Sequence, residues 1–220
     1  MRKKTFAAAA LFAAATLTLS ACGSGDNGSS PVAAVAEDGS QHQDDQAATV
    51  LDRPFTKPNL VLTDTQGKQY DLRKETAGHP TLLYFGYTHC PDVCPLTMSN
   101  IAVAKKQLPA ADQDDLRVVF VTTDPDRDTA AALGAWLKGI DPQAVGLTGD
   151  FTTIQTAARS LGISIEPPHK DKNGKTVSTH GTQVIAFSPK TNGGYLLYGE
   201  GTTVEEYTKD LPKIVKGQNP

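Results

Sequence analysis

Hydrophobic and polar positions divide the chain into an apolar run, a long polar stretch and a region with the periodicity of a folded domain. The apolar run covers residues 5–19. From Gly23 to Val50 the chain is rich in Gly, Ser, Ala, Asp and Gln and shows no apolar periodicity, which is typical of a flexible tether. We therefore predict a leader over residues 1–21, a tether over residues 22–50 and one domain over residues 51–220.

Within the domain, continuous apolar runs at residues 81–87 and 116–122 predict two buried strands. Two hairpins are also predicted: residues 59–64 with 69–72, and residues 182–187 with 195–198, the second pair flanking Asn192-Gly193-Gly194. Helices are expected at residues 95–108, 128–139 and 150–162. A last helix is expected to open at residues 202–206, where two capping-box spacings overlap.

The order of these elements predicts an α/β protein. Buried strands that alternate with helices indicate a mixed sheet covered on both faces. A βαβ core with a thiol pair after its first buried strand, followed later by an antiparallel hairpin, is the layout of a thioredoxin-like fold.

Charge excludes one class of partner. The chain has 21 Lys+Arg and 24 Asp+Glu, and the region beyond the leader is more acidic still, because Arg2, Lys3 and Lys4 all lie in the leader. No basic stripe is visible that could pair with phosphates, so we expect no nucleic acid partner.

The leader predicts export. A basic start, an apolar run and a small-residue site form the pattern of an export signal, and the run is shorter than the roughly 20 residues of a membrane-spanning helix. Leu19-Ser20-Ala21-Cys22 resembles a bacterial lipobox, which implies cleavage before Cys22 and diacylation of its thiol. We expect a domain anchored by lipid to the outer face of the bacterial cytoplasmic membrane. The alternative is an ordinary secretory signal with an incidental cysteine.

Lipidation of Cys22 leaves Cys90 and Cys94 as the free thiols, which indicates redox chemistry or a soft metal. We expect Cys94 at a helix entrance with Pro95 as the first helical residue, so that the helix dipole favours the thiolate of Cys94. A purely structural disulfide is disfavoured, because a loop of three intervening residues restricts the unfolded chain little.

The spacing favours metal over a thioredoxin-type disulfide, which uses two intervening residues, although a disulfide is not forbidden. Soft thiolates select copper(I), and imidazole suits copper in both oxidation states. His180 directly precedes a predicted strand and is the preferred third ligand, because a residue at that strand mouth can reach the end of the first buried strand. The other histidines are His42, His79, His89 and His169.

Three sequence blocks carry a family resemblance. Phe85-Gly86-Tyr87-Thr88-His89-Cys90-Pro91-Asp92-Val93-Cys94-Pro95 resembles the signature of the Sco/SenC copper chaperones. Asp124-Pro125-Asp126-Arg127-Asp128 is similar to their second block and His180 to their third, over residues 55–212 in all. The chain departs from the family around residues 177–186, which lack its acidic run and its Tyr-Leu pair.

The resemblance implies a thioredoxin-like fold and one copper, as Cu(I) or Cu(II), bound by Cys90, Cys94 and His180. It also implies a role in assembling the copper A centre of cytochrome c oxidase. The implied partners are the copper A subunit and another copper donor protein, and we expect a monomer. Asp124 is a candidate to orient His180 or to hold a water; the alternative is that it ends a strand and caps a turn.

Three functions compete. The first is a membrane-tethered metallochaperone, which is not an enzyme. The second is a thiol-disulfide oxidoreductase with Cys90 and Cys94 as its redox-active pair, which keeps the cysteines of the target's copper site reduced. The third, a thiol peroxidase, needs a Pro-x-x-x-[Thr/Ser]-x-x-Cys setting, and this setting is absent.

Overall fold

The computed structural model describes residues 47–220, so Cys22, His42, the predicted leader and nearly all of the predicted tether lie outside the described residues. Within residues 47–220, no helix is long and apolar enough to cross a membrane.

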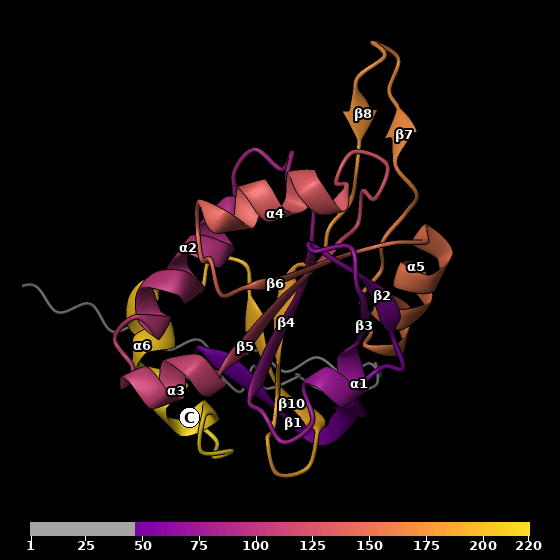
Figure 1. Ribbon diagram of the computed structural model, residues 1–220. Coiled ribbons are helices and arrows are strands. Elements are labelled where there is room, and N and C mark those ends of the chain that lie inside the picture. Colours follow the sequence, from indigo (N-terminus) through magenta and orange to yellow (C-terminus); the bar gives the residue numbers. More distant parts are fainter. Residues whose placement is uncertain (1–46) are drawn as a thin grey trace, which may run out of the picture. The chain divides into compact units, whose positions relative to one another are not determined.

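A single eight-stranded mixed sheet forms the centre of the domain (Figure 1). Its central strands run parallel, β4 with β5 and β5 with β6, whereas the flanking pairs are antiparallel. The strands, in spatial order, are β1 (Ala48–Thr56), β10 (Gly193–Gly199), β9 (Gln183–Phe187), β4 (Thr81–Gly86), β5 (Arg117–Thr122), β6 (Val145–Thr148), β2 (Val61–Asp64) and β3 (Gln69–Asp71).

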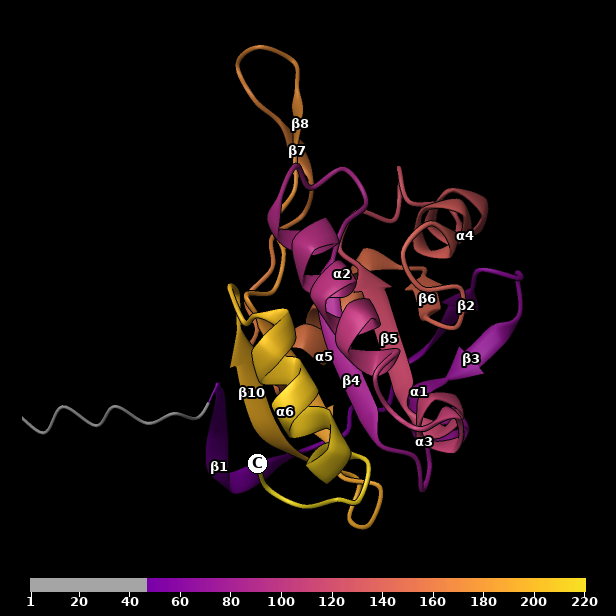
Figure 2. The ribbon, with the colours of Figure 1, turned by 90° about the vertical axis from the view of Figure 1, so that its left-hand side faces the viewer.

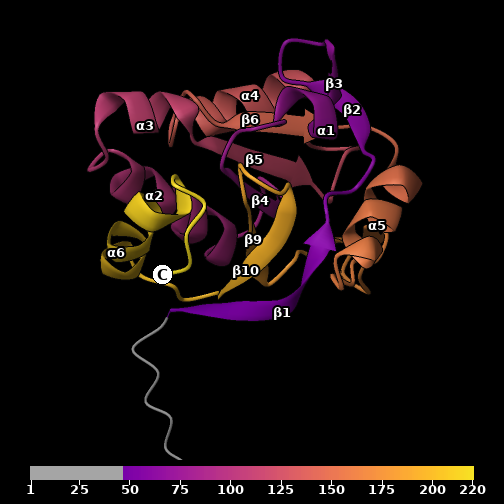
Figure 3. The ribbon, with the colours of Figure 1, turned by 90° about the horizontal axis from the view of Figure 1, so that it is seen from below.

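Helices cover both faces of this sheet (Figure 3). They are α1 (Leu72–Glu75), α2 (Val93–Lys105), α3 (Ala110–Asp115), α4 (Ala130–Lys138), α5 (Phe151–Ser160) and α6 (Val204–Ile214). One apolar cluster packs α2, α4 and α6 against one face, and a second packs α5 and α1 against the other. All six residues of β4 are buried, because alternate side chains enter the two clusters: Leu82 and Tyr84 enter the first, Leu83 and Phe85 the second.

A two-stranded ribbon, β7 (His169–Lys170) with β8 (Thr176–Val177), forms its own small sheet and projects from the domain (Figures 1 and 2). The predicted polar loop after Glu166 is therefore partly paired. The chain returns from β8 toward β9, so the ribbon lies immediately before His180 in the sequence.

The α/β class, the thioredoxin-like layout and both predicted hairpins are confirmed. Asp150, the first residue of the helix predicted over residues 150–162, is the N-cap of α5, and Thr203 with Glu206 forms a complete capping box on α6. Two helix starts differ from prediction. Helix α2 begins at Val93 rather than Pro95, because the Asp92 side chain accepts the Val93 N–H, and α4 is capped by Thr129 rather than beginning at Asp128.

Strand β1 begins at Ala48, inside the segment predicted as tether, so the domain starts before residue 51. It pairs with β10 along one edge of the sheet, and its register breaks between Val50 and Phe55. The residues at this break, Leu51-Asp52-Arg53-Pro54, are mostly polar and include a proline. They interrupt the apolar pattern by which a strand is recognised, so the sequence did not predict β1.

Candidate metal centre

The two predicted thiols lie together where β4 passes into α2. Both are free cysteines; Cys90 is in the loop and 6% exposed, and Cys94 is in the first turn of α2 and 0% exposed. The Cys94 N–H donates to the Cys90 sulfur, with 3.4 Å between N and Sγ. The helix N-terminus therefore offers its donor to Cys90, whereas the sequence predicted that its effect would fall on Cys94.

Cys94 is held in a closed, apolar position. Tyr84, on β4, donates its hydroxyl to the Cys94 sulfur at 3.5 Å. A Cβ on Gly86 would lie 2.9 Å from that sulfur, so only glycine permits this approach. Burial raises the pKa of the Cys94 thiol to about 12, and this outweighs the lowering expected from the helix dipole. The interpretation of Cys94 as the thiolate-favoured residue is therefore wrong.

Asp128 fixes the loop that carries Cys90. Its fully buried carboxylate accepts the Thr88 N–H at 2.9 Å, the Thr88 hydroxyl at 2.5 Å and the Thr122 hydroxyl at 2.7 Å. Sequence reasoning missed this role and assigned Asp128 to a helix start. The available signal was its position at the end of the acidic block that follows a buried strand.

His180 is held beside the end of β4 by its neighbours in the chain. Gly181 donates its N–H to the Phe85 carbonyl at 2.8 Å, and the Thr123 hydroxyl donates to the Thr179 carbonyl. The His180 Nδ1 lies 2.8 Å from the Gly181 carbonyl. Since a carbonyl only accepts, Nδ1 carries the proton and Nε2 keeps the lone pair that a metal requires.

Tyr87 lies in contact with both halves of the site. Its ring centroid is 6.1 Å from that of His180, and its backbone carbonyl accepts the Cys90 N–H at 3.2 Å. Burial and the two nearby thiols raise the pKa of Tyr87. In the described part of the chain no three His, Cys, Asp or Glu side chains are close enough together to hold a metal. The structure thus brings Cys90 and Cys94 together, and it places His180 against Tyr87, in the loop that is hydrogen-bonded to the end of β4.

Asp124 contacts the loop that carries His180 through Ser178 and Arg127, and not through His180 itself. Its Oδ2 accepts the Ser178 hydroxyl at 2.7 Å and pairs with Arg127, and Arg127 also donates to Ser178. These contacts anchor the chain two residues before His180, and among residues 47–220 no contact joins Asp124 to the His180 imidazole. If Asp124 orients His180, as predicted, it does so by holding the backbone before His180 and not by contacting the imidazole.

The remaining described histidines lie elsewhere. His79 pairs with Asp115, and His169 is on the exposed β7. The imidazole of His89, adjacent to Cys90 in sequence, is half exposed, with Nδ1 3.1 Å from the Thr88 hydroxyl. Its ring is thus directed to the Thr88–Asp128 anchor.

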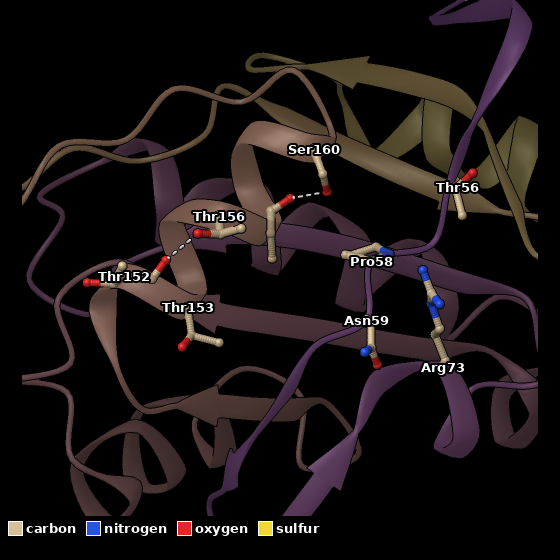
Figure 4. A pocket seen from close by; sticks show the side chains of 9 residues that line it. Thr56, Pro58, Asn59, Arg73, Thr152, Thr153, Thr156 and Ser160 are labelled. Atoms are coloured by element: carbon tan, nitrogen blue, oxygen red, sulfur yellow. Dashed lines mark hydrogen bonds between the residues drawn. The ribbon is translucent and has the colours of Figure 1, made fainter.

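A sizeable cavity of the domain lies away from the thiol pair and His180. A cavity of about 550 Å³ lies between the end of β1, α1 and α5 (Figure 4). It contains no thiol, imidazole or carboxylate; its lining is Thr56, Pro58, Asn59, Arg73, Thr152, Thr153, Thr156, Ala157 and Ser160. These groups lack the donors that a soft metal selects.

The fold and the site together define a thioredoxin-like protein with a dithiol at the end of its central strand and an imidazole beside it. A sequence model of the SCO1/SenC family matches residues 45–216, so the chain belongs to the SCO1/SenC family. A Stutzerimonas stutzeri protein, named as copper-binding, is 32% identical over 64% of this chain and 69% of its own length. The human mitochondrial SCO1 homologue is 31% identical over 64% of this chain and 46% of its own length.

Solved structures agree with this assignment. ScoI of Bradyrhizobium japonicum with copper bound is 30% identical, with a TM-score of 0.62 over 72% of this chain and 99% of that one. ScoI of Arabidopsis thaliana with copper bound is 28% identical, with a TM-score of 0.63 over 73% and 98% of the two chains. The chain spans less than half the length of three mitochondrial relatives: the bovine and zebrafish SCO2 homologues and the human SCO1 homologue.

The two thiols should differ sharply in reactivity. With iodoacetamide at pH 8, Cys90 should be alkylated first, because Cys94 is fully buried and its thiol, with a pKa of about 12, ionises only toward that pH. Peptide mapping by mass spectrometry gives the two rates, and the urea-unfolded chain, in which both thiols react alike, is the control. Equal rates in the folded chain would contradict this asymmetry.

Replacing Asp128 should loosen the thiol loop. Asp128→Ala leaves the Thr88 and Thr122 donors without their acceptor, so the free energy of unfolding should fall by about 3 kcal/mol, and alkylation of Cys94 should become faster. Asp126→Ala, an exposed position in the same block, is the matched control and should change stability by less than about 0.5 kcal/mol. A similar loss in both variants, measured by urea titration, would show that Asp128 has no special role.

Proposed function

We propose that this chain binds one copper ion through Cys90, Cys94 and His180. Copper here is cargo, to be delivered to the copper A site of cytochrome c oxidase or used to prepare that site. The observation that carries the proposal is the pair of free thiols that follow β4, with His180 in the loop that is hydrogen-bonded to the end of the same strand through Gly181. Relatives named as copper-binding or solved with copper bound support it.

The donor set suits this cargo. Two thiolates and one imidazole are soft to intermediate ligands, which favour copper(I) and accept copper(II). Two thiolates alone are too few for a closed structural zinc site. Three ligands also leave a coordination position open, through which the ligands of an acceptor can replace those of this chain one at a time.

Membership of the SCO1/SenC family supports the choice of target. BsSco, which shares the fold at 19% identity, is described as a member of the Sco family of cytochrome c oxidase assembly proteins. For this chain we propose the copper A subunit as acceptor, another copper protein as donor, and a monomer as the working form. Lipid on Cys22 would hold the domain at the outer face of the cytoplasmic membrane, where confinement raises its effective concentration near membrane-bound partners.

A second function, thiol-disulfide exchange, is favoured by one observation. Cys90 is the more accessible thiol, and its sulfur already lies against the first turn of the helix that carries Cys94. An attacking thiol that is the more accessible of the two, with a fully buried partner, is a workable arrangement for a dithiol reductant. This activity would keep the cysteines of the target's copper site reduced, and it is compatible with copper delivery.

Copper uptake should depend on the redox state and on His180. The reduced protein should bind one copper per chain and the oxidised protein far less, because ligation requires both thiolates. His180→Ala should weaken binding at least tenfold in a chelator competition, whereas His169→Ala and His89→Ala should change it little. Equal uptake by both redox forms, or a larger loss from His89→Ala, would contradict the ligand assignment.

Membrane attachment should depend on Cys22. Two acyl chains, each contributing about 0.8 kcal/mol per buried methylene, anchor a protein stably. Cys22→Ser should therefore leave the protein in the soluble fraction or as an unprocessed precursor, as followed by fractionation and intact mass. Ser20→Thr serves as the control for a change within the leader. Unaltered membrane association of Cys22→Ser would rule out the lipid anchor.

The cellular role separates the two functions. A strain that lacks the chain should lose cytochrome oxidase activity, and added copper should partly restore it, since the missing step is metal supply. If the chain is a reductase, added dithiol should restore cytochrome oxidase activity and added copper should not. The His180→Ala variant should then still complement the strain that lacks the chain. That second pattern would favour the oxidoreductase.

A further inference from the structure

The cavity between β1, α1 and α5 adjoins a second cavity, and two cations line the pair. The second cavity has a volume of about 440 Å³ and shares Thr56 and Arg73 with the first. Its lining is Pro54, Phe55, Thr56, Lys57, Arg73, Thr191, Asn192 and Gly193. Among the described residues, Lys57 and Arg73 are the charged groups of the two linings, and neither lining contains a carboxylate. Both volumes are typical of sites that bind small molecules.

Lys57, the residue after β1, is a buried cation whose partners are neutral. It is 3% exposed. Its amine donates to the Thr76 carbonyl at 3.2 Å, to the Thr76 hydroxyl at 2.7 Å and to the side-chain carbonyl of Asn192 at 3.2 Å. It also lies 5.3 Å from the centroid of the Phe187 ring. Burial lowers the pKa of Lys57 to about 8. An anion beside this amine would offset part of the cost of burying its charge.

Arg73, on α1, supplies a second positive charge at the same place. Its Nε donates to the Lys57 carbonyl at 2.7 Å, which holds the guanidinium against the Lys57 backbone. Among residues 47–220, no carboxylate lies within 4 Å of this guanidinium, and no hydrogen bond engages its two Nη groups. A guanidinium with free Nη donors matches the two oxygens of a carboxylate.

The α5 wall of the larger cavity presents oxygen lone pairs (Figure 4). Three hydroxyls of this wall donate their protons to acceptors in α5 or at its N-cap, at 2.8, 2.8 and 2.7 Å; they belong to Thr153, Thr156 and Ser160. Because a hydroxyl has one proton and two lone pairs, each of these oxygens can still accept a hydrogen bond. This wall therefore suits the hydroxyl groups of a ligand and not a second anionic group.

We propose that the paired cavities bind a small polyhydroxy carboxylate, a compound of the sugar-acid class. Its carboxylate pairs with Arg73 and lies near Lys57, and its hydroxyl groups donate to the threonine and serine oxygens of α5. The residues proposed to bind copper line neither cavity, so this site is independent of the copper centre. A neutral sugar lacks the ion pair, and a simple fatty acid leaves the α5 oxygens without donors.

The test is a titration of the full chain with three six-carbon probes, followed by NMR. Gluconate carries a carboxylate and hydroxyl groups, sorbitol carries hydroxyl groups alone, and hexanoate carries a carboxylate alone. Gluconate should shift the side-chain resonances of Arg73 and the backbone amides of Thr156 and Asn192. It should also bind at least about 10-fold more tightly than the other two probes, because each of them lacks one half of the recognition. No binding of gluconate, or equal binding of sorbitol or hexanoate, would overturn the proposal.

Two variants of α1 separate a specific site from a general effect of charge. Arg73→Gln and Lys74→Gln each remove one exposed cation from the same helix, but Lys74 lines neither cavity. Arg73→Gln should weaken gluconate binding by about 10–100-fold, as expected when hydrogen bonds to a charged group are lost. Lys74→Gln should weaken it by less than about twofold. Equal losses in the two variants would show that no specific site is present.

The role of Lys57 is tested in the unaltered chain, so that its result does not depend on how a Lys57 variant folds. Bound gluconate should raise the pKa of Lys57 above its value of about 8, because a nearby anion favours the charged amine. Arg73, the other charged group of the two linings, stays protonated throughout such a titration. NMR of the Lys57 side chain at saturating gluconate and at saturating sorbitol gives the two values. Equal pKa values with both probes would contradict a carboxylate beside Lys57.

Discussion

The last two carbonyl groups of β4 are the constraint on which the site depends. Because β4 is buried on both faces, its backbone acceptors need partners from within the protein. The Phe85 carbonyl accepts the Gly181 N–H at 2.8 Å, and the Gly86 carbonyl accepts the Thr123 N–H at 2.7 Å. One strand end thereby joins the thiol loop, the acidic block and the histidine loop, although they are far apart in sequence.

Burial then makes the two thiols unequal. Cys94 lies beneath Gly86 and beside Tyr84, in an apolar setting that favours the neutral thiol, whereas Cys90 lies nearer the surface with a backbone donor on its sulfur. A partner that approaches from solvent meets Cys90 first. The ligand exchange and the disulfide exchange that we propose would therefore both begin at the same sulfur.

Much of this arrangement could be predicted from the sequence. The apolar runs that became β4 and β5, the two hairpins and the capping box depend on local pattern, and all of them are confirmed. His180 beside the end of β4 followed from its place before a strand. Asp128, Tyr84 and Tyr87 could not be assigned roles, because their partners come from other elements or depend on how side chains pack. The burial that raises the Cys94 pKa is likewise a tertiary property.

Strand β1 has a consequence for how the protein behaves when copies of it are crowded together. It is an edge strand, so one side of its backbone is not paired within the sheet. Its register is interrupted where Asp52, Arg53 and Pro54 occur. Charge, proline and an irregular register all hinder a second chain from adding to a sheet edge. Copies of this domain held side by side would therefore resist sheet-to-sheet aggregation at this edge.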